Sequence, residues 1–345
     1  MIPAQIKQLL RRLVLVTRSI CRLSLFYLDY WTKSDAIPLN SPNLRSLKNG
    51  KIFQTAVGFN LFDGEELLID ALLSYRPYVH KLYVAYQCIG HYGNNHNNPN
   101  LEKTLYYLRD IGLIDELIKF ENFNIAESQL QFHQLLTNKM NMVVSKAREQ
   151  SCSHFMWVDN DEFFTPKQLK YVIAQTYKVW EPEGTSTNEK RLYFAGACQH
   201  LQYYKSPRFR KKVKEGEFIA TFFPIDNPSI WFEYGFPSQI SISPERKPNI
   251  YHYVTFMRFE VEMHHLSFVR HSLQEKAKSQ QLSIGKPDPF KIADRYERWV
   301  FPMLGVWSGG VEFEVTRTKS LISIPHFYND SFTKLSRGEI VKICW

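Results

Sequence analysis

Short apolar runs alternate with longer amphipathic segments between residues 52 and 158, and this alternation constrains the fold more than any other feature of the chain. The strand-like runs are 52–57, 82–86, 117–120 and 155–158, and the helical segments between them are 65–75, 101–111 and 129–149. Helices of this length between strands act as crossover connections, which favours parallel strands with helices on both faces. We therefore predict an α/β fold with a Rossmann-like, mostly parallel sheet.

The last of these strand-like runs ends abruptly in Asp159-Asn160-Asp161-Glu162, three carboxylates in four positions. Ligands of such sheets bind beyond the carboxyl ends of the strands. Strand alternation places Asp159 and Asp161 on one face and turns Glu162 away. Two hard oxygen ligands at this position favour Mg²⁺ or Mn²⁺ with open coordination sites for a diphosphate. The alternative is an ordinary acidic turn.

Two blocks of sequence carry a family resemblance. Lys139-Met140-Asn141, in the helix before this strand, and Asp159 to Phe164 together resemble family 2 type glycosyltransferases of the GT-A fold. Many of these carry Lys/Arg-Arg-Asn in a helix that leads into a strand ending in Asp-x-Asp-Glu-Phe. Met140 departs from the usual Arg, so a nucleotide contact from that side chain is lost or is made by Lys139 instead. Met263 to Arg270 is similar to the His-His-x-Ser-x-Val-Arg segment of the same group.

The resemblance spans roughly residues 51 to 280 and implies a GT-A fold, a nucleoside-diphosphate-sugar donor and a divalent metal. It implies that Asp161 is the direct metal ligand and that Asp159 lies nearer the ribose or the metal-bound waters. It also implies nucleotide contacts from the first loop, where Asn60 and Asp63 are short polar candidates. Asp63 is equally suited to cap the helix that follows. The predicted donor-binding residues are Asn60, Asp63, Lys139, Asn141, Asp159 and Arg270.

The histidine block offers a further metal ligand. Adjacent residues on a strand point to opposite faces, so only one of His264 and His265 can enter the site, and we favour His265. The alternative is a histidine satisfied within the core. Arg270 is predicted to bind the diphosphate through its guanidinium fork, or else to form a surface salt bridge. The predicted metal ligands are Asp159, Asp161 and His265.

An inverting enzyme of this kind needs a carboxylate that accepts the proton of the acceptor hydroxyl. Asp226 and Glu233 lie between the metal strand and the histidine block in the sequence and are both candidates. Asp226 is also typical of a turn before Asn-Pro. Glu233 sits among aromatic residues that suit a sugar ring and raise the pKa of a carboxyl group.

The N-terminal segment has a different character. Residues 6–30 carry an apolar stripe backed by basic residues, which predicts an amphipathic helix either on an anionic membrane surface or packed against protein. No apolar run reaches the roughly 18 residues of a membrane span. We divide the chain into this basic helix and linker (1–50), a catalytic domain (51–280) and a C-terminal extension that packs on it (281–345).

Charge and cysteine content bear on partners and compartment. The net charge of +9 favours a phosphate-bearing substrate or a polyanionic surface. Five scattered cysteines without metal or redox spacing are typical of a reducing compartment. We therefore expect a cytoplasmic enzyme, with a peripheral position on the cytoplasmic face of a membrane if the N-terminal helix binds lipid. No nucleic-acid partner is expected.

These features together predict a metal-dependent glycosyltransferase that moves a sugar from a nucleotide-sugar donor to a glycan or lipid-linked acceptor. Two other classes remain open on the sequence alone. One is a metal-dependent phosphoryl-transfer enzyme that uses the carboxylates for two metals. The other is a carbohydrate-binding relative without catalytic activity.

Overall fold

The computed structural model describes residues 46–48, 51–62, 67–90, 93, 99–121, 126, 128–180, 193–204, 206–211, 218–227, 232, 254–269 and 315–317. Several predictions lie outside these residues: the N-terminal amphipathic helix, the site residues Asp63, Glu233 and Arg270, and nearly all of the C-terminal extension.

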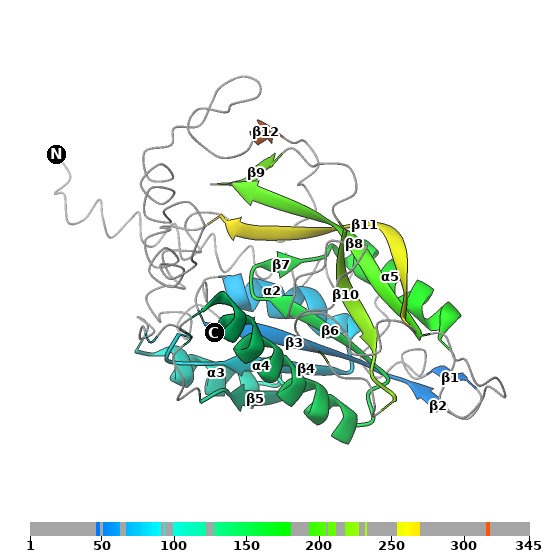
Figure 1. The fold of residues 1–345 in the computed structure, drawn as a ribbon, viewed down its shortest axis with the longest axis horizontal. Coiled ribbons are helices and arrows are strands. Elements are labelled where there is room, and N and C mark those ends of the chain that lie inside the picture. Colours follow the sequence, from blue (N-terminus) through cyan, green and yellow to red (C-terminus); the bar gives the residue numbers. More distant parts are fainter. Residues whose placement is uncertain are drawn as a thin grey trace, which may run out of the picture.

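The predicted parallel strands form one half of a ten-stranded sheet (Figure 1). They are β3 (Thr55–Leu61), β4 (Lys81–Tyr86), β5 (Glu116–Lys119) and β6 (His154–Asp159). Their spatial order is β6-β3-β4-β5, and all three pairings are parallel. The carboxyl ends of β3 and β6 are in register, since Asn60 pairs with Asp159. This half of the sheet confirms the Rossmann-like prediction.

Helices cover both faces of the parallel strands, as predicted. On one face lies α4 (Gln129–Glu149), which buries Met140, Val143, Val144 and Ala147 against the strands. On the other face lie α2 (Leu68–Tyr75), α3 (Leu101–Asp110) and α5 (Pro166–Val179). Alternate residues of β3 serve the two cores: Ala56 faces α4, whereas Val57 and Phe59 face the other layer. Period-two alternation in a strand covered on both sides explains this division.

The rest of the sheet adds antiparallel pairings to the parallel strands of residues 55–159, together with one further parallel pairing, between β8 and β11. The strand β10 (Phe218–Pro224) runs antiparallel to β6 and to β8 (Tyr193–Tyr204). A long strand, β11 (Val254–Phe268), pairs in parallel with β8 and antiparallel with the short β7 (Glu162–Phe163). The remaining strands are β9 (Ser206–Lys211), β12 (Val315–Arg317) and the separate hairpin of β1 (Ser46–Lys48) and β2 (Lys51–Phe53).

These pairings bring the histidine block of β11 to the carboxyl end of β6 through β7. The helices in the described part of the chain include none that is both long and apolar enough to cross a membrane.

Candidate functional site

The acidic stretch forms a tight turn and not a continued strand. β6 ends at Asp159, the chain turns at Asn160 and Asp161, and β7 begins at Glu162. The Glu162 carboxylate returns over this turn, and its Oε2 accepts a hydrogen bond of 2.9 Å from the backbone N–H of Asp159. Strand alternation therefore does not apply across these positions, and Glu162 does not face away as predicted.

One group of side chains surrounds the end of β3, and we call it the lysine cluster: Asn60, Gln87, Lys139 and Asp159. Lys139 Nζ donates to Asn60 Oδ1 at 2.9 Å, to Gln87 Oε1 at 3.2 Å and to the backbone oxygen of Leu61 at 3.2 Å. Asn60 Nδ2 in turn donates to Asp159 Oδ1 at 2.9 Å. The amide of Asn60 thus connects the ammonium group to the carboxylate and fixes the orientation of both.

Lys139 is fully buried, so its side chain does not reach a ligand at the surface. It stabilises the site through its hydrogen bonds to Asn60 and Gln87. Burial lowers the pKa of Lys139 from its ordinary value of 10.5 to about 7, and the nearby Asp159 carboxylate offsets part of this effect by raising it. Lys139 contacts Asn60, which contacts Asp159 in turn, and its membership of a donor site stays a prediction.

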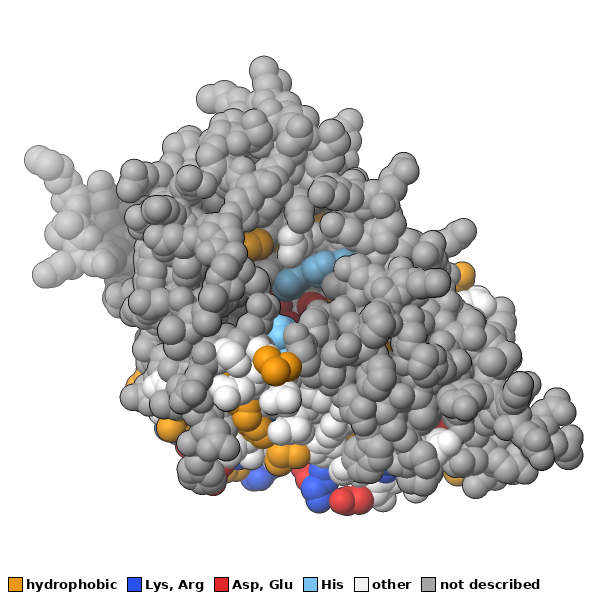
Figure 2. All heavy atoms as spheres, in the orientation of Figure 1, with side chains coloured by type: hydrophobic (Ala, Val, Ile, Leu, Met, Phe, Trp, Pro, Cys, Tyr) orange, Lys and Arg blue, Asp and Glu red, His pale blue; other side chains and the backbone are white. Residues whose placement is uncertain are grey.

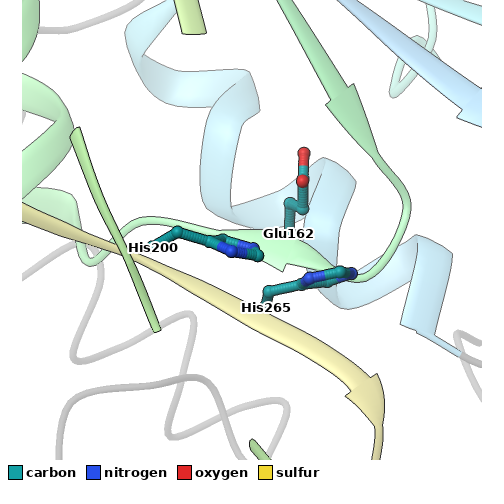
Figure 3. A group of neighbouring side chains, drawn as sticks. All are labelled: Glu162, His200 and His265. Carbon is teal, nitrogen blue, oxygen red and sulfur yellow. The ribbon is translucent and has the colours of Figure 1, made fainter. Parts of the chain in front are cut away.

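A second group lies on the other side of the turn, and we call it the imidazole cluster: Asp161, Glu162, His200 and His265. Ligand atoms of Glu162, His200 and His265 all lie within 4.8 Å of one another (Figure 3). The rings of His200 and His265 lie side by side, with their centroids 4.7 Å apart. His265 Nε2 is 3.2 Å from Asp161 Oδ1. In Figure 2, histidine and acidic side chains gather near the middle of one face, set back from the surface around them.

The strand pairings position the two adjacent histidines in opposite directions. His265 is opposite Glu162 of β7 and contacts Asp161. His264 points into the fold, where its Nδ1 lies 2.7 Å from Tyr203 Oη and its Nε2 lies 3.2 Å from Gln168 Oε1. Of the two histidines, His265 is therefore the one at the carboxylates, as the alternation along β11 predicts. Its role as a metal ligand remains a prediction.

Two predicted site residues are used elsewhere. Asn141 forms a pair of hydrogen bonds with the backbone of Phe232, donating to its oxygen at 2.9 Å and accepting from its N–H at 3.1 Å. Its amide therefore holds a neighbouring segment, which corrects the prediction that it contacts the nucleotide.

Asp226 lies near the amino end of β6, whereas Asp159 lies at its carboxyl end. It follows Pro224, which pairs with His154 at the start of β6, because β10 runs antiparallel to β6. Its carboxylate accepts a hydrogen bond of 3.1 Å from the indole of Trp180. This position corrects the prediction that Asp226 is a candidate catalytic base. The placement of Asp63, Glu233 and Arg270 lies outside the described residues.

His200 and Glu162 are the site residues that the sequence did not indicate. His200 lies on β8 and pairs with Met263 of the parallel strand β11. The pairing of β8 with β11 joins segments more than fifty residues apart in sequence, so no local signal near His200 indicates its place in the site.

The imidazole cluster fits a divalent cation on the chemistry of its donors. Asp161 and Glu162 are 3% and 2% exposed, and two imidazoles stand beside them. Buried carboxylates require compensation by a cation or by hydrogen bonds. The cluster therefore has ligand atoms and negative charge suited to a metal ion.

No protein-family model matches the chain, and no curated protein matches it. Among solved structures, it is similar to a glycosyltransferase involved in the glycosylation of the major capsid of PBCV-1, with 13% identity, coverage of 50% of this chain and 59% of that one, and a TM-score of 0.22. It is also similar to a mannose-1-phosphate geranyltransferase from Thermus thermophilus, with 12% identity, 50% coverage of each chain and a TM-score of 0.26. The chain thus spans little more than half the length of these structures. At such scores the likeness does not bear on activity, which has to be argued from the chain's own residues.

Proposed function

We propose that the chain is a glycosyltransferase that moves a sugar from a nucleoside-diphosphate-sugar donor to a hydroxyl group of a glycan or lipid-linked acceptor, with a divalent metal, Mn²⁺ or Mg²⁺. The observation that carries this proposal is the pair of clusters at the two ends of the Asp159–Glu162 turn. A nucleotide-sugar has two parts that call for different chemistry. Its nucleoside hydroxyls suit an oriented carboxylate, and its diphosphate suits a metal.

The lysine cluster is proposed to bind the nucleoside. Asn60 holds Asp159 Oδ1, so the carboxylate is oriented to accept from a ribose hydroxyl. A carboxylate that its neighbours hold in place binds a hydroxyl without losing side-chain freedom at that moment, which favours affinity. Lys139 contributes by donating hydrogen bonds to Asn60 and Gln87, which hold their side-chain amides in place.

The imidazole cluster is proposed to hold the metal, with Asp161 and His265 among its ligands. When bound, the metal supplies positive charge opposite the diphosphate as the nucleoside diphosphate leaves. The protein's own contribution is to keep these side chains in place. The backbone oxygen of Asp161 accepts a hydrogen bond of 2.8 Å from Leu266 N–H, which attaches the turn to β11 next to His265.

Glu233 remains the proposed base that takes the proton of the acceptor hydroxyl. Asn141 holds the backbone of Phe232, the residue before it in sequence, through two hydrogen bonds. Asn141 is therefore proposed to position the segment that carries the base, in place of its predicted contact with the nucleotide.

The test is donor turnover. The full chain is incubated with a panel of nucleotide sugars and Mn²⁺, with and without a chelator, and the release of free nucleoside diphosphate is measured. We expect one donor to be turned over only with metal present, and we expect Asp161→Ala to abolish this turnover while the far-UV circular dichroism stays unchanged. Asp110→Ala, which changes an exposed aspartate paired with Arg109, is the matched control and should be fully active. Full activity in Asp161→Ala would remove the assignment.

A further inference from the structure

We propose that Glu162, His200 and His265 bind one divalent ion of the transition-metal class, and that this site discriminates against Mg²⁺. The inference deepens the proposed function, on which it rests, because it adds two ligands that the sequence did not indicate and selects between the two metals. Asp159, predicted from sequence as a ligand, is not part of this set, since its Oδ1 is engaged by Asn60.

The three side chains come from three different strands that are paired with one another. Glu162 lies on β7 and is opposite His265 of β11, while His200 lies on β8 and is paired with the same strand β11 at Met263 (Figure 3). Ligand atoms bound to one ion at about 2.1 Å are roughly 3 to 4 Å apart. The observed separations of at most 4.8 Å therefore need only small side-chain rotations to close around an ion.

Glu162 is oriented by a backbone group. Its Oε2 accepts from Asp159 N–H at 2.9 Å, which fixes the carboxylate within reach of the two imidazoles. Metal-binding side chains are commonly fixed by such outer contacts, and losing them weakens metal binding. The turn thus links the two clusters. The side chain of Asp159 belongs to the lysine cluster, and its backbone N–H orients the proposed metal ligand Glu162.

The ligand types decide the class of metal. Two imidazoles and one carboxylate form a mixed nitrogen–oxygen set. Imidazole suits transition metals such as Fe²⁺, Ni²⁺ and Zn²⁺, and the carboxylate also suits Mn²⁺, whereas Mg²⁺ and Ca²⁺ take oxygen ligands, so the two imidazoles favour a transition metal over Mg²⁺. Together with Asp161, these three side chains make four protein ligands, and a six-coordinate ion keeps two positions open for the oxygens of a diphosphate. Asp161, beside His265, adds a second buried carboxylate, so the site carries two negative charges when both imidazoles are neutral, and a divalent ion neutralises them.

The experiment uses the chelator-treated full chain and Mn²⁺ as the probe. Continuous-wave electron paramagnetic resonance measures the affinity for Mn²⁺, and pulsed measurements count the ¹⁴N nuclei coupled to it. We expect two imidazole nitrogens in the wild-type protein, both replaced by ¹⁵N couplings after labelling with ¹⁵N-histidine, and no displacement of Mn²⁺ by a large excess of Mg²⁺. These readouts need no variant and do not depend on activity.

Variants then identify the ligands. His200→Gln should leave one coupled nitrogen, and both His200→Gln and Glu162→Gln should weaken Mn²⁺ binding by at least about tenfold. The control is His80→Asn, at the amino edge of the sheet, where His80 Nδ1 accepts from Thr55 N–H; it should keep both couplings and the affinity. Thermal unfolding confirms that each variant is folded.

Fewer than two imidazole nitrogens in the wild type, unchanged affinity in folded His200→Gln, or displacement of Mn²⁺ by Mg²⁺ would overturn the proposal. The donor assay separates this from the proposed function. Metal-dependent turnover with unchanged Mn²⁺ affinity in His200→Gln would leave the glycosyltransferase standing and remove His200 from its metal site. Two coupled nitrogens without turnover of any nucleotide sugar would leave the metal site standing and remove the glycosyltransferase proposal.

Discussion

The lysine cluster and the imidazole cluster lie at the two ends of one four-residue turn, yet they compensate buried charge in opposite ways. In the lysine cluster, Asn60 connects the ammonium of Lys139 to the carboxylate of Asp159, so opposite charges share one hydrogen-bond network. In the imidazole cluster, Asp161 and Glu162 are both buried beside histidines. Their charge is compensated when a proton or a metal ion joins the imidazoles.

This difference implies two kinds of behaviour. The lysine cluster is complete without a ligand, so changes within it should act on folding stability and on the orientation of the nucleoside contact. The imidazole cluster is the proposed metal site, so changes within it should act on metal binding. Variants that affect one property and not the other sharpen the comparison, and variants that affect both would break it.

The largest effect is expected for the pH dependence of stability in Lys139→Met. Burial lowers the pKa of Lys139 from its ordinary value of 10.5 to about 7. Between pH 7 and pH 10.5, Lys139 therefore binds a proton in the unfolded chain but not in the folded chain. The free energy of unfolding contributed by this residue therefore rises with pH through that window, by up to about 1.4 kcal/mol per pH unit. The Met variant has no proton to bind there, so its pH profile should lack this rise.

Denaturant unfolding at a series of pH values measures this contribution as the difference between wild type and variant. Lys103→Met, on the exposed face of α3, is the matched control and should keep the profile of the wild type. Parallel curves for wild type and Lys139→Met would show that the pKa of Lys139 is not lowered in the folded chain.

A smaller effect is expected for Asp159→Asn on donor use. The amide keeps the shape and can still accept from Asn60, but it loses the charge that favours a ribose hydroxyl. Hydrogen bonds to charged groups contribute about 1.5–3 kcal/mol, so kcat/KM for the donor should fall by roughly ten- to a hundredfold. Its Mn²⁺ affinity, measured by paramagnetic resonance, should stay close to that of the wild type because the backbone N–H of Asp159, which orients Glu162, is kept in the variant. An equal loss of Mn²⁺ affinity would mean that the two clusters form a single metal site.

The parallel half of the fold could be predicted because its signals are local. The helix α4 begins and ends where the apolar period of residues 129–149 does, and the predicted strands at 82–86 and 117–120 differ from β4 and β5 by at most one residue at each end. Lys139 and Asn60 were assigned to one donor site by the family resemblance of their segments, because Lys139 lies within the helix α4 and not at the end of a strand.

The rest depends on pairings between distant segments. Nothing near His200 indicates that β8 runs beside β11, and nothing near Asp226 indicates that β10 runs antiparallel to β6. The helix α5 was missed although its signal was present. Thr165 and Gln168 form a capping box, with Pro166 at the first helical position. The turn at Asn160 remained an open alternative because an acidic stretch after a strand is compatible with both an extended and a turned backbone.

The smallest effect is expected for Gly58→Ala, which acts on the support of the lysine cluster alone. A Cβ atom at Gly58 would lie 2.9 Å from side-chain atoms of Phe155, Trp157 and Val143, all buried. Overpacking of this kind costs about 1–3 kcal/mol, and part of it is offset because alanine restricts the unfolded chain more than glycine does. Val143 lies one turn after Lys139 on α4, so relief of the clash moves the helix that carries the ammonium. We expect a lower free energy of unfolding and weaker donor binding. The Mn²⁺ affinity should be unchanged because the proposed ligands Glu162, His200 and His265 lie on β7, β8 and β11. Loss of Mn²⁺ binding in a folded Gly58→Ala variant would show that the metal site depends on the parallel strands as much as the lysine cluster does.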